Sequence, residues 1–292
     1  MYDKNADKLI IVSASEDLAN YPADSYSPVG VVVVPSTHDV YGDGSCGVMS
    51  MKPMSLDTPD TGDTSDWFIY WGGYGTDIST LPNLNNAPYI GKGTYVGNST
   101  NTILGLHDYP RLPSDIYSAV KCPHDTDTYY NSSSSSHYQA PSPFLTDGSR
   151  NPAYYQTSFP SDISNALADF DGVGNTKILT GLATSQSDWK TASTITHSYD
   201  DGYYPAACCC WRYHTDGTKQ GDWYLPAMGE LGYIMPNFNK INTTISMLIN
   251  AYSVGVQLVR PYSYWSSSEY SSDDARGVDA DNGLVDREDK DS

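Results

Sequence analysis

The side chains with the clearest binding chemistry lie in residues 264–292, where short polar side chains are frequent. From Arg276 onward polar and apolar residues alternate, which predicts a half-buried strand with successive side chains on opposite faces. The strand would hold two sets of residues on opposite faces: Arg276, Val278 and Ala280 on one, and Gly277, Asp279 and Asp281 on the other. Because carboxylates accept hydrogen bonds and attract cations, the second face would suit a cationic or donor-rich partner.

The dipeptide Asn282-Gly283 predicts a hairpin turn after this strand, because both central residues of a type I′ turn need positive φ. Leu284 and Val285 would begin the returning strand. Two interpretations of the polar row remain open. It is either a binding face or a solvated edge whose charges discourage aggregation between strands.

Calcium chemistry is weakly supported by this segment. Residues 279–283 resemble part of a calcium loop, but the glycine is out of phase and no glutamate follows at the right distance. The three consecutive cysteines Cys208, Cys209 and Cys210 lack C-x-x-C spacing, so we expect small buried side chains rather than a zinc site. We predict no metal ion and no cofactor.

Catalytic residues are not predicted either. The six histidines show no i, i+4 pair, and no G-x-S-x-G motif accompanies them. The five cysteines indicate no disulfide framework, which suits a reducing cytoplasm. We expect a protein that is not an enzyme.

Composition and charge argue against two classes of partner. The net charge of −19 argues against nucleic acid and against an anionic membrane surface. The 25 tyrosines, with many Ser, Gly and Asn residues, resemble the composition of an antibody paratope, although a loop-rich extracellular β protein is similar. The longest apolar run, residues 29–34, is far short of the roughly twenty residues that cross a membrane. No signal peptide is evident, so we expect synthesis as a soluble cytosolic product.

The rest of the chain contains patterns of both strands and helices, which indicates an α+β fold that positions the C-terminal hairpin. An apolar β-branched run at residues 28–35 predicts a buried strand, with a returning strand at 46–51 and a shorter one at 9–12. Helices are predicted at 161–170, 176–183, 206–214, 227–234 and 238–248. Residues 1–27 are a lead-in or attachment segment, and the Pro-, Gly-, Asn- and Tyr-rich residues 55–160 read as an insertion.

Two motifs resemble known families. The stretch 221–231 is similar to the W-x-L-P-x-x-x-E-L signature of C-type-lectin-like domains of the Legionella-collagen-like C-terminal type. The stretch from Trp265 to Val285 resembles the variable region of proteins diversified by diversity-generating retroelements. Residues 171–176 are similar to the D-G-x-x-N-T sequence that precedes the first long helix of such domains. Formylglycine-generating enzymes share this fold, but the cysteine triplet lies in the wrong part of the chain for their cysteine pair.

The resemblance implies a C-type-lectin-like fold with short strands, two main helices and a large loop-rich insertion. The domain would span residues 28–292, with the insertion at about 55–160 and the variable region at about 264–292. Its conserved frame would include the motif residues Trp223, Leu225, Pro226, Glu230, Leu231, Trp265, Ser266 and Ser267. Glu230 would hold local backbone donors rather than act in catalysis. A closing strand is expected beyond the variable segment.

In the resembling family, adenines of asparagine codons are copied with errors, which yields Asp, Gly, Ser, Leu and Arg. The positions of this kind, which the resemblance marks as ligand-binding, are Asp273, Asp274, Gly277, Asp279, Asp281, Leu284, Asp286, Arg287, Asp289 and Asp291. Between them lie residues that match the fixed positions of the pattern: Ala275, Arg276, Val278, Gly283 and Val285.

The implied function is ligand or receptor binding by a phage protein at a tail-fibre tip or another virion position. Its partner would be a bacterial surface protein or glycan, together with other virion components, and avidity would come from a homo-oligomer, expected to be a trimer. Two alternatives remain: a bacterial surface adhesin, which would need an export signal, and a structural virion protein without a receptor role.

Overall fold

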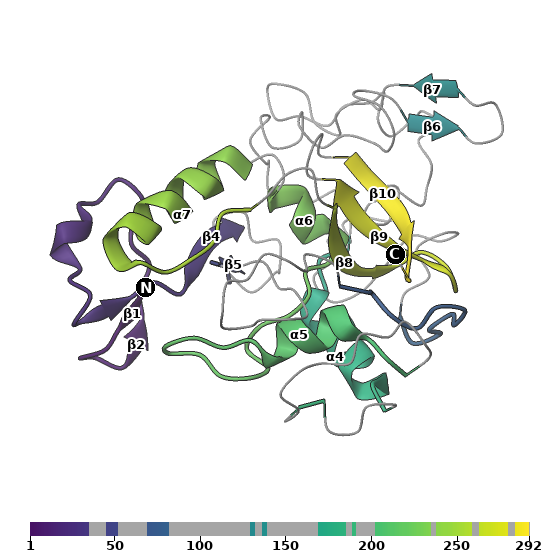
Figure 1. The fold of residues 1–292 in the computed structure, drawn as a ribbon, viewed down its shortest axis with the longest axis horizontal. Coiled ribbons are helices and arrows are strands. Elements are labelled where there is room, and N and C mark those ends of the chain that lie inside the picture. Colours follow the sequence, from purple (N-terminus) through teal and green to yellow (C-terminus); the bar gives the residue numbers. More distant parts are fainter. Residues whose placement is uncertain are drawn as a thin grey trace, which may run out of the picture.

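The computed structural model describes residues 1–34, 45–51, 69–81, 129–131, 136–138, 169–184, 189–190, 202–234, 238–258, 263–279 and 284–291. Helices and strands both occur, which confirms the α+β class (Figure 1). In chain order the elements are β1 (Tyr2–Asp3), β2 (Lys8–Leu9), the 3-10 turn η1 (Leu18–Asn20), β3 (Tyr26–Ser27), β4 (Gly30–Val34), β5 (Gly47–Ser50), β6 (Tyr129–Asn131), β7 (Ser136–Tyr138), α4 (Gly172–Leu182), α5 (Pro205–Arg212), α6 (Met228–Ile234), α7 (Phe238–Tyr252), β8 (Ser263–Glu269), β9 (Asp274–Asp279) and β10 (Leu284–Asp289).

The C-terminal strands form an antiparallel sheet in the order β10-β9-β8. The strand pairing of the predicted hairpin is therefore present, with Val285 opposite Val278 and Arg287 opposite Arg276, whereas the turn expected at Asn282-Gly283 lies outside the described residues. The register of β8 against β9 shifts between Trp265 and Glu269, so β8 contains an irregularity opposite the middle of β9. The central position of β9 matters below, because both of its edges are covered by neighbouring strands.

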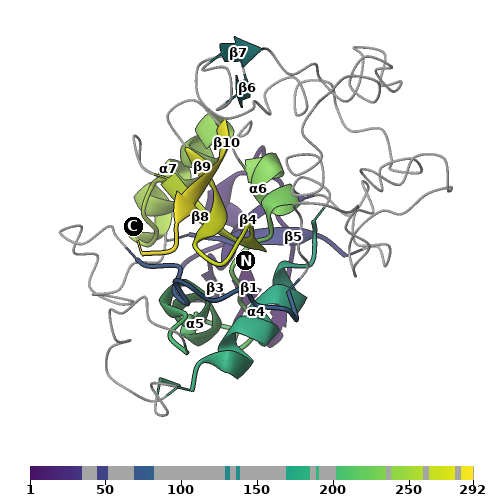
Figure 2. The ribbon, with the colours of Figure 1, turned by 90° about the vertical axis from the view of Figure 1, so that its right-hand side faces the viewer.

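The hydrophobic core lies between this sheet and the helices. Leu179 of α4, Ala207 of α5, Leu225 and Ala275 of β9 belong to one buried cluster. In both ribbon views α4 and α5 lie side by side next to the C-terminal sheet (Figure 2), and α4 and α6 pack on β8. The helices and the sheet thus share one core.

Residues 69–81 correct the expected insertion at 55–160. Trp71 is 1% exposed, and Trp71, Ile78 and Leu81 are members of the same core cluster. This stretch is therefore a core segment, since it buries large apolar side chains against α5 and β9 rather than decorating the surface. The rest of the expected insertion, apart from the β6–β7 pair, lies outside the described residues.

Four of the predicted helices are present with shifted ends. The helix expected at 176–183 is α4, which begins earlier because the Asp171 carboxylate caps it by accepting the Gly174 N–H at 3.1 Å. The helix expected at 238–248 is α7, which extends to Tyr252. Its predicted apolar stripe is buried, as expected: Phe238, Ile241, Ile245 and Leu248. Most of the helix expected at 161–170 lies outside the described residues.

The lead-in at 1–27 forms its own sheet in the order β2-β1-β3, on the side of the molecule opposite the C-terminal sheet (Figure 1). The strand expected at 9–12 is confined to β2, and Leu9 and Ile11 are exposed. Ser27 Oγ donates to Asp216 Oδ2 at 2.7 Å, which ties the lead-in to the loop after α5.

The predicted hairpin of strands 28–35 and 46–51 is present as the antiparallel pair β4–β5. This pair is a separate two-stranded sheet in the described residues. Helix α6 packs against β4 on one side and β8 on the other, so it links the two sheets. None of the helices in the described ranges has the length and apolar character that a membrane crossing requires.

Candidate ligand-binding face and its buried support

A buried polar network joins the start of α4 to β8. Asp169 Oδ2 accepts hydrogen bonds from Ser268 Oγ at 2.6 Å and from Asn175 Nδ2 at 2.9 Å. The Asn175 amide also donates to Ser267 Oγ at 3.3 Å. Asp169, Asn175, Ser267 and Ser268 are all buried, and together with Ser266 they are called the motif network below. The network connects the D-G-x-x-N-T and W-S-S-S segments that the sequence singled out.

The W-x-L-P segment packs directly on the same strand. The Ser267 N–H donates to the Pro226 carbonyl at 2.7 Å, and the Met228 N–H donates to Ser268 Oγ at 3.0 Å. The Leu225 N–H donates to Thr176 Oγ1 at 2.9 Å. The two motifs therefore lie in one folding unit, which is what a shared frame requires.

Glu230 has the role that the sequence assigned to it. Its Oε2 accepts the Ala227 N–H at 2.7 Å, and its Oε1 accepts the Tyr224 hydroxyl at 2.7 Å. A Cβ at Gly172 would collide with Glu230 Oε2 and with the Tyr224 ring, so glycine is required at that close approach. Glu230 thus fixes the first turn of α6 against the start of α4.

Two tryptophan indoles cross-link β8 to the core segment 69–81. Trp265 Nε1 donates to the Ile69 carbonyl at 2.7 Å, and Trp71 Nε1 donates to the Ser266 carbonyl at 2.7 Å. Ser266 Oγ in turn donates to the Arg276 carbonyl of β9 at 2.8 Å. The remaining motif residues occupy supporting positions: Leu225 and Leu231 are buried, Pro226 is half-buried, and Trp223 is half-buried with its Nε1 donating to Thr218 Oγ1.

Burial raises the pKa of Asp169 to about 6, although the hydrogen bonds from Ser268, the Asp171 N–H and Asn175 act in the opposite direction. The carboxyl at the centre of the motif network therefore titrates within the mildly acidic range. This makes the stability of the network dependent on pH.

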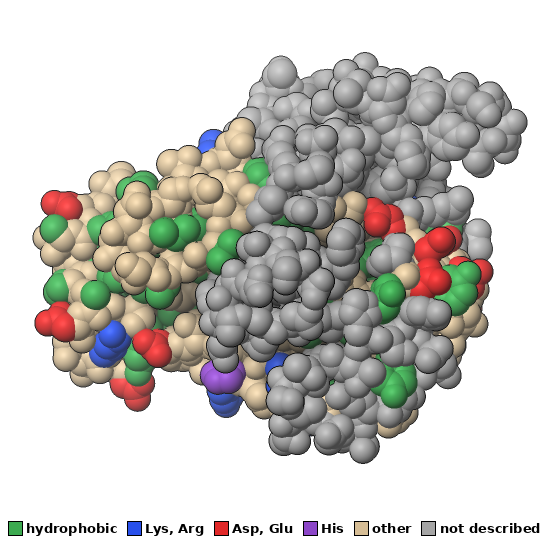
Figure 3. All heavy atoms as spheres, viewed as in Figure 1, with side chains coloured by type: hydrophobic (Ala, Val, Ile, Leu, Met, Phe, Trp, Pro, Cys, Tyr) green, Lys and Arg blue, Asp and Glu red, His purple; other side chains and the backbone are tan. Residues whose placement is uncertain are grey.

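Four of the ten predicted ligand-binding positions lie together at one end of the C-terminal sheet. Asp273 and Asp289 are exposed, and Asp274 and Asp291 are half-exposed. Acidic side chains gather on the side of the molecule where β9 and β10 lie (Figure 3). These four aspartates are called the acidic face below.

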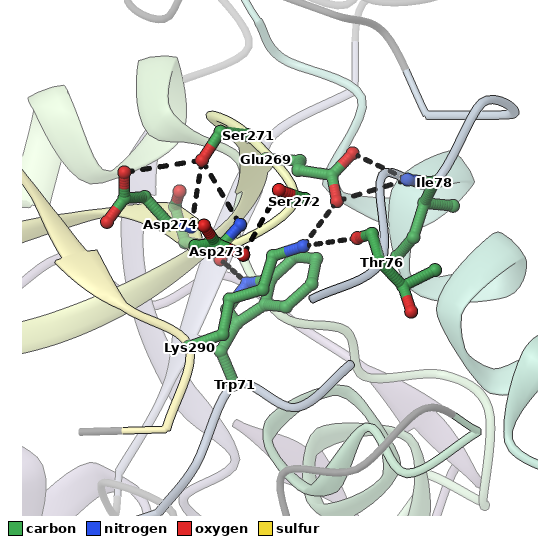
Figure 4. Close-up of polar contacts among 10 residues, drawn as sticks. Trp71, Thr76, Ile78, Glu269, Ser271, Ser272, Asp273, Asp274 and Lys290 are labelled. Carbon is green, nitrogen blue, oxygen red and sulfur yellow. Dashed lines mark hydrogen bonds and ion pairs between the residues drawn. The ribbon is translucent and has the colours of Figure 1, made fainter. Parts of the chain in front are cut away.

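The turn between β8 and β9 holds two of these aspartates. Ser271 Oγ accepts the N–H groups of Asp273 at 3.2 Å and Asp274 at 3.0 Å, and it donates to Asp274 Oδ2 at 3.2 Å (Figure 4). Ser272 Oγ donates to Asp273 Oδ1 at 3.1 Å. The backbone of the turn is thus fixed by its own serines.

Tyr74 is an exposed aromatic residue beside the acidic face, and sequence reasoning missed it. It is 42% exposed, and the Gly75 N–H after it donates to the Ser272 carbonyl at 3.0 Å. The negative charge of Asp273, followed by that of Asp291, raises the pKa of Tyr74. Tyr74 therefore lies within the electric field of the face. The only signal in the sequence was the aromatic run at residues 67–75.

Gly277 does not lie in an open polar row. It is buried in the centre of the sheet, opposite Trp265 on one side and Asp286 on the other. A Cβ there would lie 3.1 Å from the Tyr264 carbonyl and 3.8 Å from the Trp265 ring. The simple alternation failed here because Trp265, directly opposite Gly277 on β8, places its ring against this position.

The register also divides the predicted positions between two faces of the hairpin. Asp286 lies opposite Gly277, whereas Asp289 lies opposite Asp274. Alternate positions along a strand share a face, so Asp274 and Gly277, three positions apart in β9, lie on different faces. The other predicted positions in the strands are Asp279, Leu284 and Arg287. Asp281 lies outside the described residues.

Lys290, which sequence reasoning also missed, is fully buried between the exposed Asp289 and the half-exposed Asp291. Its Nζ lies 2.6 Å from Glu269 Oε1 and donates to the Thr76 carbonyl at 2.8 Å (Figure 4). Burial lowers the pKa of Lys290 and raises that of Glu269. The pair is a buried ion pair directly beneath the acidic face.

The cysteine triplet matches its predicted burial in part, because Cys208 is buried whereas Cys209 and Cys210 are half-buried. Cys208 is buried in the core cluster, and Cys209 and Cys210 pack against it. Burial raises the pKa of the Cys209 thiol to about 12, which disfavours the nucleophilic thiolate. Within the described ranges, no group of three or more His, Cys, Asp or Glu side chains is arranged to hold a metal ion.

Comparison of the chain with protein-family models, with curated proteins and with solved structures finds no match. The function must therefore be inferred from the geometry of the described residues and from the motifs that they contain.

Proposed function

We propose that this protein is a ligand-binding protein with a C-type-lectin-like fold, in which a fixed frame presents a diversified C-terminal surface. In this role it is a receptor-binding protein of a phage, at a tail-fibre tip or another virion position, and it recognises a bacterial surface protein or glycan. The observation that supports this most is the contrast between buried and exposed side chains within residues 263–291. Ser266, Ser267, Ser268 and Glu269 are buried and hydrogen-bonded, and Trp265 is half-buried, whereas the acidic face lies at the surface.

The chemistry of the acidic face favours a cationic ligand. Four carboxylates surround an exposed tyrosine ring, and both groups attract ammonium or guanidinium groups. The carboxylates are short and exposed, so each contact is weak in water. A homo-oligomer, expected as a trimer, would supply the missing affinity through avidity.

Sequencing of many copies of the gene from one population tests the diversified surface. We expect substitutions to concentrate at the positions of the acidic face and at the other predicted variable positions except the buried Gly277. An even spread of substitutions along the chain would instead favour a structural virion protein.

A cell-binding assay tests the acidic face itself. The variant Asp273→Asn/Asp274→Asn/Asp289→Asn/Asp291→Asn should lose binding to the bacteria that the wild type binds. A matched control removes four exposed carboxylates elsewhere: Asp7→Asn, Asp17→Asn, Asp24→Asn and Asp222→Asn. Equal loss of binding in both variants would show that net charge, and not this face, determines recognition.

A further inference from the structure

Lys290 is the point at which three segments of the chain meet. Its N–H donates to the Asp273 carbonyl at 2.8 Å, and its carbonyl accepts the Gly72 N–H at 3.1 Å. Its ammonium donates to the Thr76 carbonyl and lies over the Trp71 ring, 4.9 Å from the centroid. One buried residue thus connects the end of β10, the β8–β9 turn and the segment that contains Tyr74.

Glu269 completes the connection from the other side. Its two carboxylate oxygens accept the Ile78 N–H at 3.2 and 3.3 Å, and Oε1 pairs with Lys290 (Figure 4). Glu269 is 3% exposed. A carboxylate buried to this degree is costly unless a cation and hydrogen-bond donors satisfy it. Lys290 therefore has to occupy its place when Glu269 is ionised.

We propose that the Glu269–Lys290 pair is a latch that positions the acidic face. It fixes Asp289, the last residue of β10, and Asp291, two residues further on, relative to Asp273 and Tyr74. The inference rests on the proposed function, because the latch matters for recognition only if the acidic face binds a ligand.

The location of the pair distinguishes a latch from ordinary core packing. The residues on both sides of Lys290 belong to the acidic face, while Lys290 itself points inward. Gly72 and Thr76, which flank Tyr74 in sequence, are both hydrogen-bonded to Lys290. Surface side chains can therefore change while the backbone beneath them keeps its place. Lys290 and Glu269 would be positioning residues for recognition.

Hydrogen exchange of individual amides tests the latch without any receptor. Lys290→Met leaves a buried carboxylate unpaired and is expected to destabilise the whole protein. The double variant Glu269→Gln/Lys290→Met removes both charges and keeps an acceptor for the Ile78 N–H. We expect the double variant to recover most of the lost melting temperature, yet the Gly72 and Gly75 amides should still exchange about tenfold faster than in the wild type.

A control variant separates the latch from general loss of stability. Asn242→Ala removes hydrogen bonds to Leu258, far from the acidic face in sequence, and should raise exchange there without affecting Gly72 or Gly75. In the double variant the pKa of Tyr74, followed by NMR, should also fall toward its ordinary value as the aspartates move away. A double variant that does not fold, or one with wild-type exchange at Gly72 and Gly75, would overturn the proposal.

The outcome for the latch is distinct from the outcome for the proposed function. If the receptor-binding role is wrong, the acidic-face variant shows no specific loss of cell binding, while the hydrogen-exchange pattern remains as expected. If the latch is wrong, the Gly72 and Gly75 amides of the double variant exchange as in the wild type, while the acidic face still determines binding.

Discussion

The Ser268 hydroxyl donates a 2.6 Å hydrogen bond to Oδ2 of Asp169, although the two residues are 99 positions apart in the chain. Both side chains are buried, so the bond is made in a low-dielectric interior where an unsatisfied partner is costly. It joins the strand that leads into the acidic face to the residues that precede α4. The proposed frame depends on this bond and its neighbours in the motif network.

Stability should depend on the protonation of Asp169. Its pKa is 3.8 in the unfolded chain and about 6 in the folded protein, so the neutral form favours folding. Protonated Asp169 adds about 3 kcal/mol to the free energy of unfolding. This stabilisation is present in full below pH 3.8 and is lost as the pH rises through about 6. Urea unfolding at pH 4 and pH 7 measures it against Asp169→Asn. The wild type should lose more stability than the variant over this interval, and equal losses would contradict the prediction.

Replacement of Glu230 should release the first turn of α6. Glu230→Ala removes the acceptor of the Ala227 N–H and of the Tyr224 hydroxyl, which should lower the free energy of unfolding by about 3 kcal/mol. Tyr224→Phe removes one of these bonds and should cost about half as much. Chemical denaturation measures both, and a Glu230→Ala variant as stable as the wild type would show that the carboxylate has no structural role.

Gly277 should behave as a frame position in spite of its place in the variable segment. Gly277→Asp would bury a carboxylate next to the Trp265 ring, which should cost at least about 2 kcal/mol. Asp273→Gly, at an exposed position of the acidic face, should change stability by less than about 0.5 kcal/mol. Thermal unfolding of the two variants decides the point. Similar melting temperatures would return Gly277 to the set of freely variable positions.

Tyr74 should contribute to recognition without contributing much to the fold. Its ring is exposed, so Tyr74→Ala should leave the melting temperature nearly unchanged but weaken binding to bacteria about tenfold. Tyr74→Phe retains the ring and should keep part of the affinity. If Tyr74→Ala binds as well as the wild type, the ligand does not contact this part of the acidic face.

The sequence predicted the frame better than it predicted the surface. Motif residues such as Glu230 and Ser267 were identified because their stretches resemble the motifs of known families, and the helix at 238–248 followed from the periodicity of its apolar residues. Lys290 could not be found in this way. It lies in a run of charged residues that is typical of solvated chain, and its burial depends on Glu269 and on the distant Thr76.

Long-range packing also explains the other two differences. Residues 69–81 lie in a loop-rich stretch with no clear period, and tertiary contacts place Trp71 in the core, where it packs on Tyr204 and donates to the Ser266 carbonyl. Gly277 falls on the polar face of the predicted alternation, but the Trp265 ring and the Tyr264 carbonyl of β8 lie next to it. Neither the burial of Trp71 nor that of Gly277 can be predicted from the neighbouring residues in the sequence.

A comparison of two displayed libraries by protease resistance tests the central claim, a fixed frame beneath an interchangeable surface, most directly. One library randomises the acidic face, and the other randomises Asp169, Asn175, Ser267 and Ser268 of the motif network. We predict that most members of the first library remain resistant and that few members of the second do. Loss of resistance at similar frequency in both libraries would contradict the account.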